Sequence, residues 1–189
     1  MNQFTAFLDA CVLFPAPMRD LLMELAVSDL FRPRWSDTVH EEWITAVLRG
    51  RPDLTRAVLD RTREMLESHA RDARVTGFEP LIEGLVLPDE NDRHVLAAAI
   101  KGRADLIVTN NLRDFPPDVL AQWDLEARHP DAFLVDQFHL SKSLFLEAVR
   151  TIRERLKNPP KHADQYLDAL RKCGLVATAK EIEPYKNLI

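Results

Sequence analysis

The sequence lacks long hydrophobic runs and has no basic stretch at its start. Its apolar stretches, such as residues 11–15, are short and interrupted, whereas a helix that crosses a bilayer needs roughly 20 apolar residues. The first ten residues contain no Lys or Arg, so the basic beginning of a secretory signal is missing. We therefore expect a cytoplasmic protein without a membrane segment.

Cysteine is also scarce. The two cysteines, Cys11 and Cys173, supply neither a framework of disulfides nor the paired spacing of a zinc site. We expect both of them to be small buried residues.

The net charge of −5 argues at first against a nucleic-acid partner, because phosphate binding usually requires a positive surface. The charge is unevenly distributed, however. Residues 139–172 contain eight Lys or Arg and four Asp or Glu, so this segment is positive while the remainder is strongly negative. The segment is therefore a candidate contact for nucleic acid, with an acidic partner protein as the alternative.

Buried strands alternate with amphipathic helices in the first part of the chain. Leu106, Ile107 and Val108 are consecutive apolar residues, which is typical of a parallel strand covered on both faces. Strands separated by helices imply βαβ units and an open, mostly parallel sheet, and hence an α/β fold. The expected strands are residues 4–9, 31–35 and 104–109, and the expected helices are residues 18–29, 36–49, 53–71 and 89–102.

The pattern changes beyond Pro116. We expect helices at residues 117–123, 141–157 and 162–173 and a strand at residues 132–138. Two prolines, Pro159 and Pro160, separate the last two helices, which favours a helical hairpin. We therefore divide the chain into an α/β domain, residues 1–130, and an accessory C-terminal helical segment, residues 131–189, packed on the core.

Four acidic side chains end strands or lie on helices of the α/β domain. They are Asp9, Glu42, Asp92 and Asp114. The carboxyl ends of parallel strands meet at one edge of a sheet, so Asp9 and Thr109 are expected near each other at that edge.

The order and spacing of these acidic residues resemble those of the PIN-domain nucleases, especially the VapC-type toxins of bacterial toxin–antitoxin pairs. Asp9 matches the aspartate of the family's first strand, and Glu42 matches a glutamate six residues after a serine, here Ser36. Asp92 matches best, because an alanine-rich helix and then a strand follow it. The resemblance covers about residues 4–116 and implies a PIN-like three-layer fold, in which helices flank a central, mostly parallel sheet and a C-terminal helical extension follows.

The family's Thr-x-Asp motif is changed in this sequence to Thr109-Asn110-Asn111. Asn111 stands where the fourth aspartate is expected and can offer a carbonyl oxygen but no negative charge. Asp114, three residues further on, is the candidate replacement. The resemblance makes Thr109 a hydroxyl ligand or a residue that orients a ligand, so Thr109 and Asn111 are expected to support the site.

Carboxylates suit Mg²⁺ and Mn²⁺, which prefer hard oxygen ligands. Such an ion lowers the pKa of a bound water and neutralises charge on a phosphate during displacement. The resemblance therefore implies a Mg²⁺- or Mn²⁺-dependent endoribonuclease in which Asp9, Glu42, Asp92 and Asp114 are both catalytic residues and metal ligands. It also implies a homodimer, an antitoxin partner, and a structured RNA such as tRNA or rRNA as the target.

Simpler interpretations of the same residues remain open. Asp9 and Asp92 also suit helix caps, and Asp114 suits a turn. Glu41 competes with Glu42, because both lie on the same expected helix.

Two other functions compete with the nuclease. A catalytically weakened PIN-like module that binds RNA or protein is one of them, because Asn111 removes a carboxylate. A phosphohydrolase of the haloacid-dehalogenase type is the other, but it needs a second aspartate where Cys11 stands. His94 is interpreted as a surface histidine without a role in the site.

Overall fold

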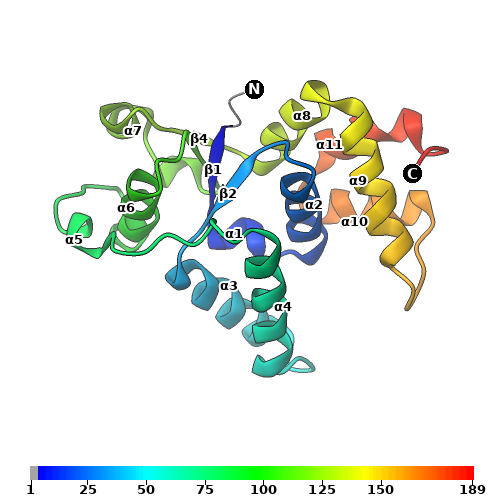
Figure 1. The fold of residues 1–189 in the computed structure, drawn as a ribbon, viewed down its shortest axis with the longest axis horizontal. Coiled ribbons are helices and arrows are strands. Elements are labelled where there is room, and N and C mark those ends of the chain that lie inside the picture. The colour runs from blue at the N-terminus through cyan, green and yellow to red at the C-terminus, as the bar shows by residue number, and fades with distance from the viewer. Residues whose placement is uncertain (1–3) are drawn as a thin grey trace. The chain divides into compact units, whose positions relative to one another are not determined.

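The computed structural model describes residues 4–189, which form two compact units (Figure 1). The first unit contains the described residues up to Phe14 together with Phe31–His129. The second unit contains Pro15–Leu30 together with Pro130–Ile189. Over the described residues, no helix combines the length and the apolar character that crossing a membrane requires.

The first unit contains a four-stranded sheet in which each neighbouring pair of strands is parallel. The strands follow the order β2-β1-β3-β4, and their bounds are β1 Thr5–Leu8, β2 Arg32–Arg34, β3 Leu106–Val108 and β4 Glu126–Arg128. Every residue of β1 and β3 is buried, as expected for central parallel strands covered on both faces. The register places Phe7 beside Arg34 on one side and Ile107 on the other. The predicted α/β class with a mostly parallel sheet is confirmed.

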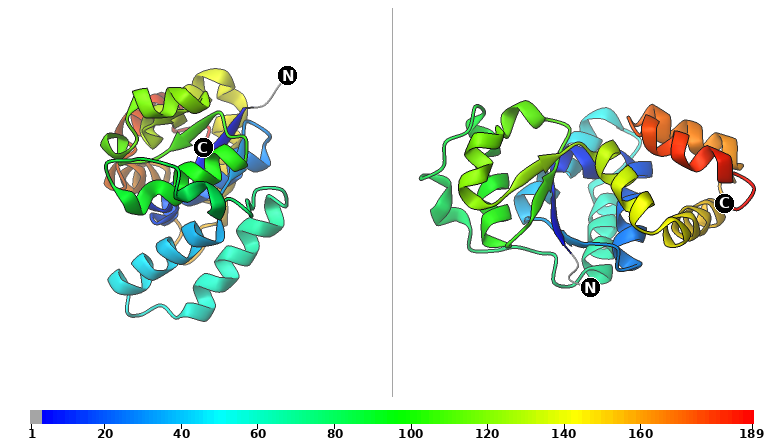
Figure 2. Two further views of the ribbon diagram at one scale, coloured as in Figure 1. Left: turned by 90° about the vertical axis from the view of Figure 1, so that its left-hand side faces the viewer. Right: turned by 90° about the horizontal axis from the view of Figure 1, so that it is seen from above.

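Within the described residues, the first unit also contains six α-helices, four of which correspond to the helices predicted at residues 36–49, 53–71, 89–102 and 117–123. The six are α1 Ala10–Leu13, α3 Asp37–Gly50, α4 Arg56–His69, α5 Glu79–Ile82, α6 Arg93–Lys101 and α7 Pro117–Leu120, with short 3₁₀ helices η1 Glu90–Asp92, η2 Leu112–Asp114 and η3 Ala121–Trp123. The start of α3 is fixed by Ser36, whose hydroxyl accepts a hydrogen bond from the Val39 N–H at 3.2 Å. Helices α3 and α4 lie side by side (Figure 2).

The second unit is entirely helical. Its elements are α2 Ala16–Val27, α8 Pro130–Leu140, α9 Lys142–Arg155, α10 Ala163–Lys172, α11 Val176–Ile182 and the 3₁₀ helix η4 Glu183–Tyr185. Helix α2 packs against α9 and α10, and α11 packs against α8 and α10. Asp131 holds the start of α11, because its carboxylate accepts the Ala177 and Thr178 N–H groups at 2.8 Å each and the Thr178 hydroxyl at 2.7 Å.

Residues 132–138 were predicted as a strand, and this prediction is wrong because they lie within α8. The apolar run was interpreted as a strand, yet the buried residues Phe133, Leu134, Gln137 and Phe138 recur with the spacing of one helical face. The short strand β4 and the helices α1, α5 and α11 were not predicted. The structure also groups α2 with the C-terminal helices, whereas the sequence analysis placed it with the α/β domain.

Candidate active site

Asp9 follows β1 directly and is held by three donors. Its Oδ1 accepts a hydrogen bond from the Ala10 N–H at 2.6 Å, and its Oδ2 accepts from the Thr109 hydroxyl at 2.7 Å and from the Cys11 thiol at 3.1 Å. The residue is buried, with 6% of its surface exposed. Asp9 therefore caps α1, as one interpretation of the sequence suggested, and its carboxylate is also fixed at the carboxyl edge of the sheet.

Thr109 connects the ends of the two central strands. Besides donating to Asp9, its hydroxyl oxygen accepts a hydrogen bond from the Asn111 N–H at 3.0 Å, and the side chain is fully buried. The Asn110 N–H donates to the Cys11 sulfur at 3.3 Å. Thr109 thus helps to fix the position of the Asp9 carboxylate, and the Asn111 side chain is exposed.

Asp92 lies where η1 passes into α6. Its own carboxylate makes no capping hydrogen bond. The cap of η1 is instead Asp89, whose carboxylate accepts the Asn91 N–H at 2.9 Å. Asp89 therefore has the capping role that was considered for Asp92, and the half-buried Asp92 carboxylate does not cap a helix.

Negative charges converge on Asp92. Its pKa is raised from 3.8 to about 6, first by burial and then by the charges of Asp9, Asp89 and Asp114. His94 acts in the opposite direction and lowers this pKa. The structure therefore brings Asp9, Asp92 and Asp114, which come from three separate parts of the sequence, into one acidic cluster.

Asp114 closes the short helix η2, and its side chain is only 19% exposed. Its N–H donates to the Asn111 carbonyl oxygen at 3.0 Å, which forms the turn that the sequence suggested. The exposed Arg113 lies close by, with its Nε 3.9 Å from the Asp114 carboxylate. Asp114 is thus both a turn residue and a charge that acts on Asp92.

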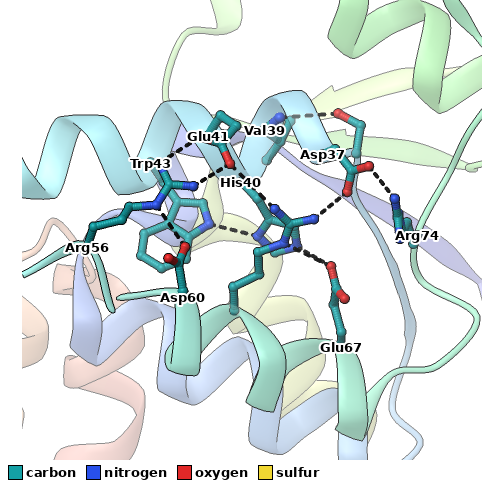
Figure 3. A network of polar contacts seen from close by, with 11 residues as sticks. Asp37, Val39, His40, Glu41, Trp43, Arg56, Asp60, Glu67 and Arg74 are labelled. Atoms are coloured by element: carbon teal, nitrogen blue, oxygen red, sulfur yellow. Dashed lines mark hydrogen bonds and ion pairs between the residues drawn. The ribbon is translucent and has the colours of Figure 1, made fainter. Parts of the chain in front are cut away.

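The two neighbouring glutamates of α3 have different partners. Glu41 is directed at α4 (Figure 3), where its carboxylate lies 2.6 Å from Arg56 and 3.5 Å from Arg63. The hydrogen bonds from Arg56 lower the pKa of Glu41. Glu42 lies instead within 2.9 Å of the His94 ring on α6. Glu41 therefore serves the α3–α4 contact, and Glu42 is the glutamate that faces the helix of Asp92.

His94 is a residue that the sequence analysis set aside. It was interpreted as a surface histidine, but its side chain is only 13% exposed and contacts Glu42. The available signal was its place two residues after Asp92, at the start of the alanine-rich helix. That position by itself does not reveal the contact with α3.

The donor chemistry of the cluster fits a divalent cation. Within residues 4–189, no three His, Cys, Asp or Glu side chains already stand in the geometry of a metal site. The carboxylates of Asp9, Asp92 and Asp114 nevertheless supply hard oxygen donors. The raised pKa of Asp92 reflects, in part, repulsion that a bound cation would relieve.

Two family models and one curated relative match this chain. A family model described as "PIN domain" matches residues 5–113, and one described as "VapC50 C-terminal domain" matches residues 130–184. A protein of Mycobacterium tuberculosis (strain ATCC 25618 / H37Rv), named "Putative ribonuclease VapC50", is 43% identical over 79 residues, which cover 42% of this chain and 47% of that protein. The chain thus aligns with about half the length of this curated relative. No solved structure matches the chain.

The two family models match different parts of the chain. The PIN domain model extends over β1, α3, α6 and β3, the elements that carry or adjoin Asp9, Glu42, Asp92 and Thr109. The second model covers α8, α9, α10 and α11. Because the first match spans more than half of the residues, the chain belongs to the PIN-domain family.

Proposed function

We propose that this protein is a Mg²⁺- or Mn²⁺-dependent endoribonuclease that hydrolyses RNA phosphodiester bonds and acts as the toxin of a toxin–antitoxin pair. The observation that carries the proposal is the half-buried Asp92 carboxyl, whose pKa is raised first by burial and then by the charges of Asp9, Asp89 and Asp114. Family membership and the printed name of the relative, a ribonuclease, support it. A divalent cation in the cluster would acidify a water and neutralise charge on the phosphate.

Each residue of the site has a distinct part in this proposal. Asp9 and Asp92 would hold the cation, and Asp114 would supply the third carboxylate in place of the charge that Asn111 lacks. Thr109 keeps the Asp9 carboxylate in place through its 2.7 Å hydrogen bond. Glu42 lines an open hollow of about 320 Å³ on the face of α3 and is 43% exposed, so its carboxylate is accessible from solvent.

The partners belong to the same proposal. We expect a structured RNA such as tRNA or rRNA as substrate, an antitoxin as inhibitor, a homodimer and a cytoplasmic location. Much of the positive charge in residues 139–172 is used within the second unit, because Arg150 pairs with Glu154 at 2.9 Å and Arg155 pairs with Glu24 at 2.6 Å. Within the described residues, five cations of this segment have no carboxylate partner, and its contribution to RNA binding therefore rests on them: Lys142, Arg153, Lys157, Lys161 and Lys172.

The test is RNA cleavage by the purified protein with and without Mn²⁺. Asp9→Asn and Asp92→Asn should each abolish cleavage while the protein stays folded, because each removes a charged ligand. Asp118→Asn, an exposed aspartate on α7, is the matched control and should cleave normally. Cleavage by a folded Asp9→Asn variant at the wild-type rate, or cleavage that persists in EDTA, would refute the proposal.

A weakened module that binds RNA or protein without cutting it is the second candidate, and Asn111 is the observation that favours it. Such a protein should bind Mn²⁺ poorly and leave RNA intact, so the same titration distinguishes the two. Membership of the PIN-domain family removes the haloacid-dehalogenase alternative.

A further inference from the structure

His94 contacts Glu42 and also acts electrostatically on Asp92. It occupies the first turn of α6, and its Nε2 lies 2.9 Å from Glu42 Oε1 on α3. Its other ring nitrogen, Nδ1, is buried and has no hydrogen-bond partner among residues 4–189. The contact with Glu42 is therefore the polar contact that orients the ring.

The two side chains of this contact differ in their exposure to solvent. The imidazole is 13% exposed, whereas the Glu42 side chain is 43% exposed. An exposed glutamate has several rotamers available, and fixing one of them costs conformational entropy. In the part of the chain that the structure describes, no Lys or Arg pairs with Glu42, while its neighbour Glu41 is held by Arg56 and Arg63. The rigid partner that can restrict Glu42 is thus His94.

We infer that His94 is a positioning residue, which holds the Glu42 carboxylate toward the cluster of Asp9, Asp92 and Asp114 so that Glu42 can complete the ligand set. The inference rests on the proposed function. Residues that orient metal ligands in this way commonly change metal affinity by about 10- to 100-fold when they are replaced.

The geometry selects the variants for a test. His94→Gln places an amide N–H close to the position of Nε2 and keeps a donor for Glu42, whereas His94→Asn places its amide near Nδ1, too short to reach. His94→Ala removes both nitrogens. His139→Ala is the matched control, because His139 also has a carboxylate within 4.0 Å, that of Glu181, but lies in the second unit.

The primary measurement is the Mn²⁺ affinity of each folded protein by calorimetry, followed by kcat and KM for RNA cleavage. We expect His94→Ala and His94→Asn to bind Mn²⁺ at least 10-fold more weakly and to lower kcat more than they change KM. His94→Gln should return to within about threefold of the wild-type affinity, and His139→Ala should match the wild type. If His94→Ala does not fold, the comparison of Gln with Asn at the same position carries the test.

A double-mutant cycle separates positioning from a general structural effect. Once Glu42→Gln is present, His94→Ala should cause almost no further loss of Mn²⁺ affinity, because the carboxylate that His94 orients is gone. Equal losses from His94→Ala with and without Glu42, or equal affinities of the Gln and Asn variants, would overturn the inference while leaving the nuclease proposal intact. A wild-type protein that neither binds Mn²⁺ nor cleaves RNA would refute the proposed function, and this inference with it.

Discussion

The raised pKa of Asp92 predicts that removing its charge stabilises the metal-free protein. The perturbation is Asp92→Asn, which keeps the shape of the side chain and removes the negative charge. The pKa of Asp92 rises from 3.8 to about 6 through burial and the charges of Asp9, Asp89 and Asp114. Since each pKa unit corresponds to about 1.4 kcal/mol, the shift sets an upper limit of about 3 kcal/mol. Asp92 is half-buried and partly screened by water, so we expect about 1 to 2 kcal/mol.

The sign of the effect follows from the direction of the shift. The folded protein binds the Asp92 proton more tightly than the unfolded chain does, so this group favours folding most below about pH 4 and the benefit is lost as the pH rises through about 6. Asp92→Asn has no carboxyl group at this position, so it does not lose stability in this way as the pH rises. The variant should therefore exceed the wild type in its free energy of unfolding at pH 7, and the advantage should vanish near pH 4.

Urea denaturation in EDTA, monitored by tryptophan fluorescence, measures this difference. The three tryptophans, Trp35, Trp43 and Trp123, all lie in the first unit, and the first two are fully buried, so the signal reports the unit that contains Asp92. Adding Mn²⁺ should reverse the order, because the wild type binds the ion more tightly and is stabilised by it. A variant that is less stable than the wild type at pH 7, or an advantage that is the same at pH 4 and pH 7, would refute the reasoning.

Further predictions concern the fourth acidic group and two structural contacts. Asp114→Asn should weaken Mn²⁺ binding whereas Asn111→Asp should preserve or strengthen it, and equal calorimetric affinities for Asp114→Asn and the wild type would leave a site without this carboxylate. His40→Leu should lower the free energy of unfolding by about 1 to 3 kcal/mol in urea titrations. The Trp43 indole N–H donates to His40 Nδ1 at 2.9 Å, and in the variant it loses this buried acceptor. An unchanged midpoint would show that the N–H finds another acceptor. Asp131→Ala should lower the free energy of unfolding by about 1 to 2 kcal/mol, because it removes the cap of α11. In this variant, backbone hydrogen exchange should be faster in α11 than in α3. Uniform protection of the two helices would count against the cap.

The sheet and the long helices could be predicted because their signals are local. The three consecutive apolar residues of β3 indicate a strand buried on both faces, and the apolar face of α6 ends at Gly102, where the sequence predicts the stop. The segment 132–138 could not be assigned in this way. Over so short a stretch, consecutive apolar residues suit a buried strand and a buried helix equally well, and it is packing within the second unit that decides.

The site residues also differ in whether the local sequence pattern reveals their contacts. Asp9 and Thr109 were predictable neighbours, because the carboxyl ends of parallel strands share one edge of the sheet. The choice between Glu41 and Glu42 depends on Arg56 and Arg63, which belong to another helix and are invisible in the local pattern. His94 was missed for the same reason, since its contact joins α6 to α3 across a long separation in the sequence.

The membership of α2 in the second unit has a consequence for synthesis on the ribosome. Its buried residues Met18, Leu21, Leu22 and Leu25 are fully enclosed in the finished protein, yet their helical partners α9 and α10 begin only at Lys142. At typical translation rates of about 5 to 20 residues per second, this nascent helix waits on the order of 10 s before those partners exist. During that interval α2 exposes its apolar face. A transcript truncated before α9 would therefore yield a product prone to aggregation rather than an independently folded PIN domain.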